Sequence, residues 1–92
     1  MRPVLVVSAD IGNQHSASVV VAVMTTKVAA KKFPVNVYLP ANDPLPEEGE
    51  VRCRSLYELP KDELKGYRAS LTVAQMSEVD AALRVALSLR HT

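Results

Sequence analysis

One stretch of the chain, Ser18 to Thr25, is rich in valine and alanine, has an unbroken apolar run from Val19 to Met24, and contains neither glycine nor proline. β-Branched side chains favour extended backbone. A uniformly apolar run of this length is typical of a central strand that is covered on both faces. The stretch therefore predicts a sheet at the centre of the fold.

Other segments have weaker strand patterns. Val4 to Val7 is short and rich in β-branched residues, which indicates a buried strand entered through Pro3. Val35 to Leu39 and Glu50 to Leu56 both alternate apolar with polar residues, as half-buried strands do. Tyr67 to Leu71 is a candidate for a last short strand. The sequence thus predicts four or five strands.

The remaining chain divides into loops and helix. Segments 10–18 and 40–49 are rich in turn-forming residues and predict loops, and Pro60 to Lys65 predicts a short helical turn. A helix is predicted to begin at Thr72, because Thr72 and Gln75 have the spacing of a capping box. Apolar residues then recur every three or four positions, which gives the helix one apolar stripe: Met76, Val79, Leu83, Ala86 and Leu87.

Strands followed by one terminal helix predict a mainly β (α+β) fold, in which a small twisted β-barrel or rolled sheet is covered by a helical lid. The chain has 92 residues, of which 48% are apolar and 23% charged, as expected for one ordinary folded domain over residues 1–92.

Composition excludes several classes of protein. A net charge of +1 provides no general attraction for nucleic acid, so any polyanion site must be local. The longest apolar run, Val19 to Met24, is far below the roughly 20 residues of a membrane helix. Cys53 is the single cysteine and no signal peptide is recognisable, so we expect a soluble protein of the reducing cytoplasm, with Cys53 as a buried filler. His15 and His91 are too far apart in sequence to predict a metal site, and we expect no cofactor.

The order of several motifs resembles the MazF/PemK family of toxin endoribonucleases. The likeness runs from Arg2 to about Leu89 and includes Arg-Pro-Val-Leu-Val-Val-Ser-x-Asp-x-x-Asn, the valine run ending in Thr25-Thr26, Pro34, Gly49-Glu50-Val51 and Lys61-Asp62-Glu63-Leu64. Each motif is weak, whereas their order and spacing are specific. The resemblance implies a homodimer with an SH3-like β-barrel of the MazF/CcdB type, and a MazE-like antitoxin partner whose disordered tail competes with RNA.

The resemblance also implies a chemistry. Family members cut single-stranded RNA without a metal and leave a 2′,3′-cyclic phosphate and a 5′-hydroxyl, and the catalytic pair carried over is Arg2 and Thr25. A guanidinium can grip the phosphate oxygens on which negative charge develops, and a threonine hydroxyl can donate a further hydrogen bond. Arginine is a poor base, so the general base stays unassigned, with His15 as a remote candidate.

Several residues are candidates for RNA binding: Asp10, Asn13, Thr26, Arg52, Arg54 and Ser55. Each has an ordinary structural explanation as well. Asp10 and Asn13 either fix the geometry of a turn or contact RNA. Arg52 and Arg54 alternate along one strand, where they form either a phosphate track or a solvated strand face. Taken without the resemblance, Arg2 and Thr25 would be a surface arginine and a strand-end threonine.

The chain departs from the family at three places, one of which is Ala9 where an Asn is commoner in the opening loop. Members usually carry a strand and a loop before Arg-Pro, whereas only Met1 precedes it here, so we expect this strand and an active-site loop to be missing. Ser55-Leu56-Tyr57-Glu58 stands where many members have Gln-x-x-Arg, so the cleavage sequence cannot be transferred. The main alternative is a non-catalytic SH3-like barrel module that binds RNA or an antitoxin peptide. The sequence fits a topoisomerase-poisoning toxin of the related fold less well, because such toxins depend on a C-terminal tryptophan and this chain contains none.

Overall fold

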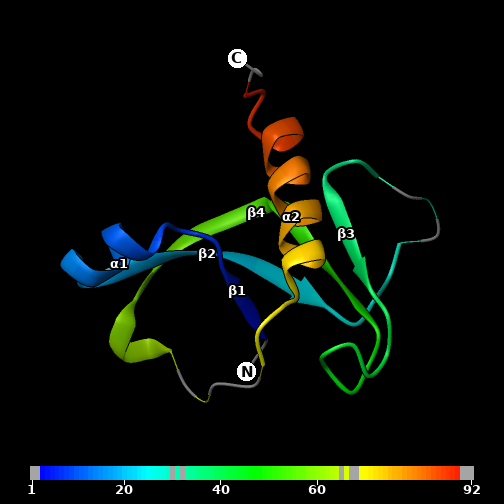
Figure 1. Ribbon diagram of the computed structural model, residues 1–92, viewed down its shortest axis with the longest axis horizontal. Coiled ribbons are helices and arrows are strands. Elements are labelled where there is room, and N and C mark those ends of the chain that lie inside the picture. The colour runs from blue at the N-terminus through cyan, green and yellow to red at the C-terminus, as the bar shows by residue number, and fades with distance from the viewer. Residues whose placement is uncertain (1–2, 30, 32, 65, 67–68, 90–92) are drawn as a thin grey trace.

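The computed structural model describes residues 3–29, 31, 33–64, 66 and 69–89. Four antiparallel strands form one sheet in the order β1-β2-β4-β3, and the long helix α2 crosses one face of it (Figure 1). The strands are β1 (Val4–Val6), β2 (Ser18–Thr25), β3 (Asn36–Leu39) and β4 (Gly49–Pro60). The helices are α1 (Asp10–His15), the short 3-10 helix η1 (Lys61–Glu63) and α2 (Val73–Ala86).

The sheet is curled because the pairing of β4 with β2 is interrupted along its length. Its first residues pair with β3 and with the end of β2, and its last residues pair with the start of β2. Between these regions the register jumps, since Ala22 lies opposite Leu56 and Val23 lies opposite Arg52. Such an irregularity bends a strand and increases its twist. The result is an antiparallel half-barrel with a C-terminal helix, which confirms the predicted fold class and is consistent with an SH3-like barrel.

The core lies between the sheet and α2. Val37, Leu39 and Val51 are buried from the sheet, and Val79 and Ala82 are buried from the helix. The predicted capping box is present: the Thr72 backbone N–H donates to the Gln75 side chain at 2.9 Å, and the Gln75 N–H donates to the Thr72 hydroxyl at 3.1 Å. The local sequence therefore determines where α2 begins, and packing determines which face it buries.

Several sequence-based expectations were wrong in detail. Segment 10–18 contains the six-residue helix α1 and is not wholly a loop. β1 is an edge strand with no fully buried residue, because it pairs only with β2. β4 continues past Leu56 to Pro60, where it pairs with the start of β2. Leu87 is 51% exposed just past the end of α2 and lies outside the buried stripe.

Within the last strand predicted, Tyr67 and Arg68 lie outside the described residues, and Ala69 to Leu71 are not in a strand. The chain there runs into the N-terminus of α2. Among the helices described, none is both long and apolar enough to cross a bilayer, and α2, the longest, has 14 residues.

Candidate active site

The C-terminal end of β2 carries the threonine singled out from the sequence. Thr25 is the last residue of β2 and lies opposite Glu50 of β4. Its hydroxyl oxygen accepts a hydrogen bond from the Lys27 backbone N–H at 3.1 Å, which leaves the hydroxyl proton able to donate elsewhere. Thr25 is half-buried, and Thr26 is exposed immediately after it.

Gly49 brings the two strands unusually close at this point. A Cβ atom built on Gly49 would lie 2.7 Å from the Thr25 carbonyl oxygen. A methyl group cannot occupy that position unless the backbone moves, so glycine permits β4 to start directly beside Thr25. The backbone of the catalytic candidate is therefore fixed by its neighbour on β4.

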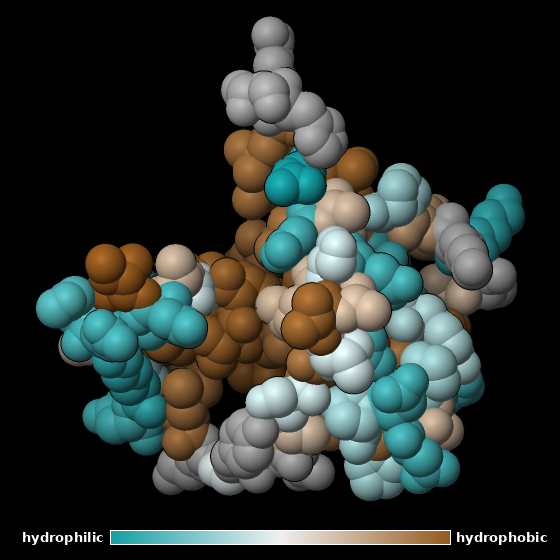
Figure 2. Space-filling view, viewed as in Figure 1, coloured by the Kyte–Doolittle hydropathy of each residue, from teal (hydrophilic) through white to brown (hydrophobic). Residues whose placement is uncertain are grey.

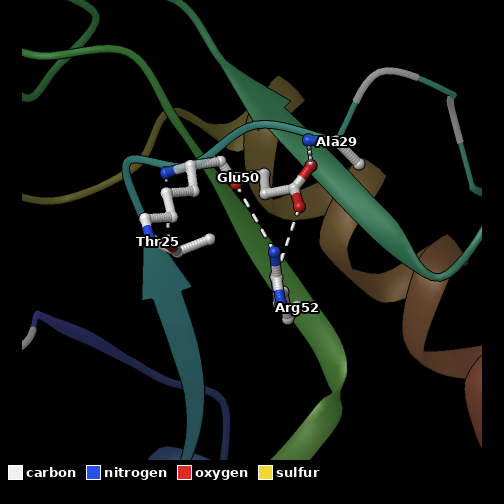
Figure 3. Close-up of polar contacts among 5 residues, drawn as sticks. Thr25, Ala29, Glu50 and Arg52 are labelled. Atoms are coloured by element: carbon white, nitrogen blue, oxygen red, sulfur yellow. Dashed lines mark hydrogen bonds and ion pairs between the residues drawn. The ribbon is translucent and has the colours of Figure 1, made fainter.

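Thr25, Glu50 and Arg52 share one face of the sheet. Residues directly opposite each other in an antiparallel pair point to the same face, and so do residues two apart along one strand. Val51 and Cys53 point the other way, into the core, and neither is exposed. Figure 3 shows Glu50 and Arg52 projecting from β4 toward the segment that follows Thr25. A threonine hydroxyl, a carboxylate and a guanidinium thus occupy one corner of the sheet.

Glu50 is buried there, although it is acidic. Only 5% of its side chain is exposed, whereas 43% of the Arg52 side chain is. The two are joined by an ion pair of 3.3 Å between Arg52 Nε and Glu50 Oε1. In the sequence, Glu50 stands out only as part of the Gly49-Glu50-Val51 motif, with no role predicted for it. Its signal was the pairing of opposite charges two residues apart on one strand face.

The N-terminal end of β1 lies beside the same corner. The Met24 backbone N–H donates to the Pro3 carbonyl at 3.3 Å, and Val4 lies opposite Val23. Arg2, the other catalytic candidate, lies outside the described residues. Arg54 and Ser55 are exposed on β4, in the stretch that bulges out of the pairing with β2.

Three other candidates lie away from Thr25. Asp10, Asn13 and His15 belong to α1, which lies between the end of β1 and the start of β2. An eight-residue strand at about 3.3 Å per residue separates the two ends of β2 by more than 20 Å. The structure therefore does not bring His15 near Thr25 within one chain, as a general base there would require.

Asn13 has a structural role that accounts for its place in the motif. Its side-chain oxygen accepts from the Ser8 hydroxyl at 2.5 Å, and its side-chain nitrogen donates to the Ser8 carbonyl at 3.1 Å. The Ser8 hydroxyl oxygen in turn accepts from the Val20 N–H at 3.0 Å. These bonds secure the connection from β1 to α1 against β2, which is the turn-fixing alternative offered by the sequence.

Among the described residues, neither the cysteine nor a histidine forms a second candidate catalytic or metal site. Cys53 is fully buried, as predicted, and burial raises the pKa of its thiol. His15 is exposed, and His91 lies outside the described residues. No group of three histidine, cysteine or acidic side chains in the described part of the chain is arranged to hold a metal ion.

An open apolar cleft of about 1130 Å³ lies along β1. Its lining includes Val4, Leu5, Met24, Tyr57 and Leu59, with Asp62 and Glu63 of η1 at the same cleft. The cleft reaches the end of β2 through Met24. Its lining is mainly apolar, so it is suited to a peptide or protein side chain and not to a phosphate.

Solved structures place this geometry in a known class. An endoribonuclease in complex with its cognate antitoxin, from a mycobacterial species, matches with a TM-score of 0.88 and 35% identity, covering 99% of this chain and 84% of that one. The Mycobacterium tuberculosis toxin MazF-mt6 matches with a TM-score of 0.86 and 26% identity, covering 98% and 89% of the two chains. The curled sheet with its terminal helix is thus the fold of MazF toxins.

Sequence comparison agrees with the structural match. Endoribonuclease MazF1 of Mycobacterium bovis is 36% identical over 88 residues, which cover 96% of this chain and 80% of the relative. Endoribonuclease MazF6 of Mycobacterium tuberculosis is 37% identical over 90 residues, covering 96% and 79%. Residues 1–87 match the sequence model of the family described as PemK-like, MazF-like toxin of type II toxin-antitoxin system. The chain belongs to this family.

Proposed function

We propose that this protein is the toxin of a type II toxin-antitoxin pair and that it acts as an endoribonuclease on single-stranded RNA. The observation that carries the proposal is the corner at the end of β2, where the Thr25 hydroxyl and the Arg52 guanidinium share one sheet face. The corner occurs in a chain whose relatives are named endoribonucleases. A hydroxyl donor and a cation on one face are what a phosphate-cleaving site requires.

The proposed reaction uses the RNA's own 2′-hydroxyl as the nucleophile. The 2′-oxygen loses its proton to a base and forms a bond to the adjacent phosphorus, while the bond from phosphorus to the 5′-oxygen breaks and that oxygen takes up a proton. The products are a 2′,3′-cyclic phosphate and a 5′-hydroxyl. Negative charge grows on the non-bridging oxygens, where arginine N–H groups and the Thr25 O–H would donate.

Arg2 is proposed as the main phosphate clamp. It precedes Pro3 in the sequence, and the Pro3 carbonyl is bonded to the backbone next to Thr25. Arg52 is proposed as a second phosphate ligand, and three exposed residues nearby as RNA contacts: Thr26, Arg54 and Ser55. No such role is proposed for Asp10 or Asn13, because α1 lies at the other end of β2.

We propose further that the toxin works as a cytoplasmic homodimer and is inhibited by a MazE-like antitoxin. Figure 2 shows apolar side chains gathered over the sheet between α1 and α2, on the face turned to the viewer. Exposed apolar residues of the chain include Val6, Val20, Val85 and Leu87. Apolar surface of this kind on a small protein favours a protein partner. One similar solved structure is of an endoribonuclease bound to its cognate antitoxin, which supports a partner of that type.

The proposal is tested by incubating the purified protein with a long mixed-sequence RNA in EDTA and mapping the new ends. We expect cleavage at a defined sequence, with 2′,3′-cyclic phosphates and 5′-hydroxyls. If RNA is bound but never cut, the result would contradict the endoribonuclease proposal and support a non-catalytic binding module. Cleavage that stops in EDTA and returns with a divalent metal would contradict the metal-free chemistry.

A further inference from the structure

Glu50 is a buried acid whose burial the core does not explain. Its neighbours on β4, Val51 and Cys53, point into the core beneath α2, so Glu50 points to the opposite face of the sheet. Only 5% of its side chain is exposed on that face. A buried carboxylate is costly unless it is paired and hydrogen-bonded, so its partners indicate what it does.

Both carboxylate oxygens of Glu50 have partners in the region that follows Thr25. Oε1 accepts from Arg52 Nε at 3.3 Å, and Oε2 accepts from the Ala29 backbone N–H at 3.4 Å. Arg52 Nη2 donates in turn to the Lys27 carbonyl at 3.4 Å. Figure 3 shows how these contacts connect β4 to the segment after β2. Glu50 therefore links the guanidinium to the backbone of residues 27–29.

These contacts bear on both proposed phosphate ligands. Arg52 is held along one edge of its guanidinium, and its side chain remains 43% exposed. Arginine has five N–H donors, of which the Glu50 and Lys27 contacts use two, so donors remain for a ligand. Thr25 is oriented by the Lys27 N–H at 3.1 Å, and Lys27 belongs to the same segment that Glu50 secures at Ala29.

We propose that Glu50 is a positioning residue for RNA cleavage, because it holds the Arg52 guanidinium against the 27–29 segment so that Arg52 donates to the same phosphate as Thr25. This inference rests on the proposed endoribonuclease function and adds a residue to it. Glu50 acts through Arg52 and does not touch the substrate. Both of its carboxylate oxygens already accept from protein groups, Arg52 Nε and the Ala29 N–H, which is the arrangement of a positioning residue and not of a free general base.

The test is a double-mutant cycle in single-turnover cleavage of an RNA that carries one mapped site. Glu50→Gln removes the charge that orients Arg52, and Arg52→Met removes the guanidinium while keeping a long side chain. A displacement of about 1 Å in a catalytic group lowers rates on the order of a hundredfold, so Glu50→Gln should lower the cleavage rate constant tenfold to a hundredfold. Substrate affinity, measured on an uncleavable 2′-deoxy analogue, should change much less.

The cycle separates positioning from general structural support. If Glu50 acts through Arg52, adding Glu50→Gln to Arg52→Met causes no further loss beyond about twofold. Glu48→Gln is the matched control, because Glu48 is an exposed acid just before β4 that accepts from the Tyr38 hydroxyl at 2.6 Å. Its cleavage rate should equal that of the wild type. Circular dichroism and melting temperature verify the fold of each variant.

The outcomes are distinct. Losses that multiply in the double variant, or a Glu50→Gln rate equal to that of Glu48→Gln, would overturn the positioning role and leave the proposed function standing. A wild-type protein that binds but never cuts RNA would overturn both. If Glu50→Gln does not fold, Glu50→Leu replaces it, since leucine fills a similar volume and needs no polar partner. The same loss of rate is then expected.

Discussion

The contact between Gly49 and Thr25 gives a sharp test of how the site is built. Gly49→Ala places a methyl group where only 2.7 Å separates it from the Thr25 carbonyl oxygen. The obstacle is backbone in a paired strand, not a flexible side chain, so β2 and β4 must separate at this point. Overpacking of this kind costs about 1–3 kcal/mol of the free energy of unfolding. For a domain of this size, each kcal/mol lowers the melting temperature by roughly 4–8 °C.

Gly12→Ala is the matched control. Gly12 lies in α1, and a Cβ there meets nothing within 4 Å. Alanine in an exposed helix is about 0.5–1 kcal/mol more favourable than glycine, so this variant should melt at the wild-type temperature or slightly above it. Both variants are compared by thermal unfolding at one protein concentration, and their RNA cleavage rates are measured at a temperature where both are folded.

Displacement of the Thr25 backbone by Gly49→Ala should also slow RNA cleavage. Because the Thr25 hydroxyl is proposed to donate to the phosphate in the transition state, we expect Gly49→Ala to lower the cleavage rate constant by at least tenfold while Gly12→Ala leaves it unchanged. If Gly49→Ala melts and cleaves like Gly12→Ala, the close approach of β4 does not hold Thr25 in place. A variant that is destabilised but fully active would separate stability from the site and refute this reasoning as well.

Three other predictions concern stability and pH. Val79→Ala removes a fully buried side chain beneath the sheet and should cost about 2 kcal/mol in chemical denaturation, whereas Val85→Ala, at a position 53% exposed, should stay within about 0.5 kcal/mol of the wild type. Thr72→Ala removes one half of the capping box and should cost about 1 kcal/mol, seen as a shift of the denaturant midpoint without a change of slope. Burial raises the pKa of the Cys53 thiol, so the unfolded chain loses this proton first, and stability should fall as the pH rises past the usual cysteine value of about 8.5. Cys53→Ala should show a weaker fall over the same range, and an identical fall would contradict this assignment.

The parts of the fold that local chemistry determines were predictable. The start of α2 follows from Thr72 and Gln75, whose side chains satisfy each other's free backbone donors. The valine-rich run predicted β2, and alternating apolar and polar residues predicted β3 with its buried Val37 and Leu39. In each case the signal lies within a few residues of the element that it determines.

The parts that depend on distant residues were not predictable. β4 extends to Pro60 because the start of β2 pairs with it, as Ser18 does with Pro60 itself. α1 has a glycine near its middle and no side-chain cap at its N-terminus, so its sequence alone favours a loop. The connection into α1 is secured from β2, where the Val20 N–H donates to the Ser8 hydroxyl, which is itself bonded to Asn13. Tertiary contacts overrode a weak local preference in both places.

The residues of the candidate site likewise include some that the sequence predicted and one that it did not. Thr25 was identified from the family resemblance and Arg52 from its alternation with Arg54, and the structure brings Thr25 and Arg52 to one sheet face. The spacing of Glu50 and Arg52 is a sequence signal for an ion pair, but the burial of Glu50 was not predictable, since it depends on the 27–29 segment. His15 looked available as a base because segment 10–18 was expected to be a loop of undetermined path, whereas the structure holds it in α1, at the opposite end of β2 from Thr25.

The central claim is that residues at the C-terminal end of β2 form the RNA-cleaving site, and Thr25→Ala tests this claim most directly. The measurement is the single-turnover rate constant for forming a 2′,3′-cyclic phosphate in EDTA, compared with Ser77→Ala on the exposed face of α2. Loss of a donor to the transition-state oxyanion should lower the rate about a hundredfold in Thr25→Ala and leave Ser77→Ala at the wild-type rate. A folded Thr25→Ala protein that cleaves as fast as the wild type would show that the active site lies elsewhere.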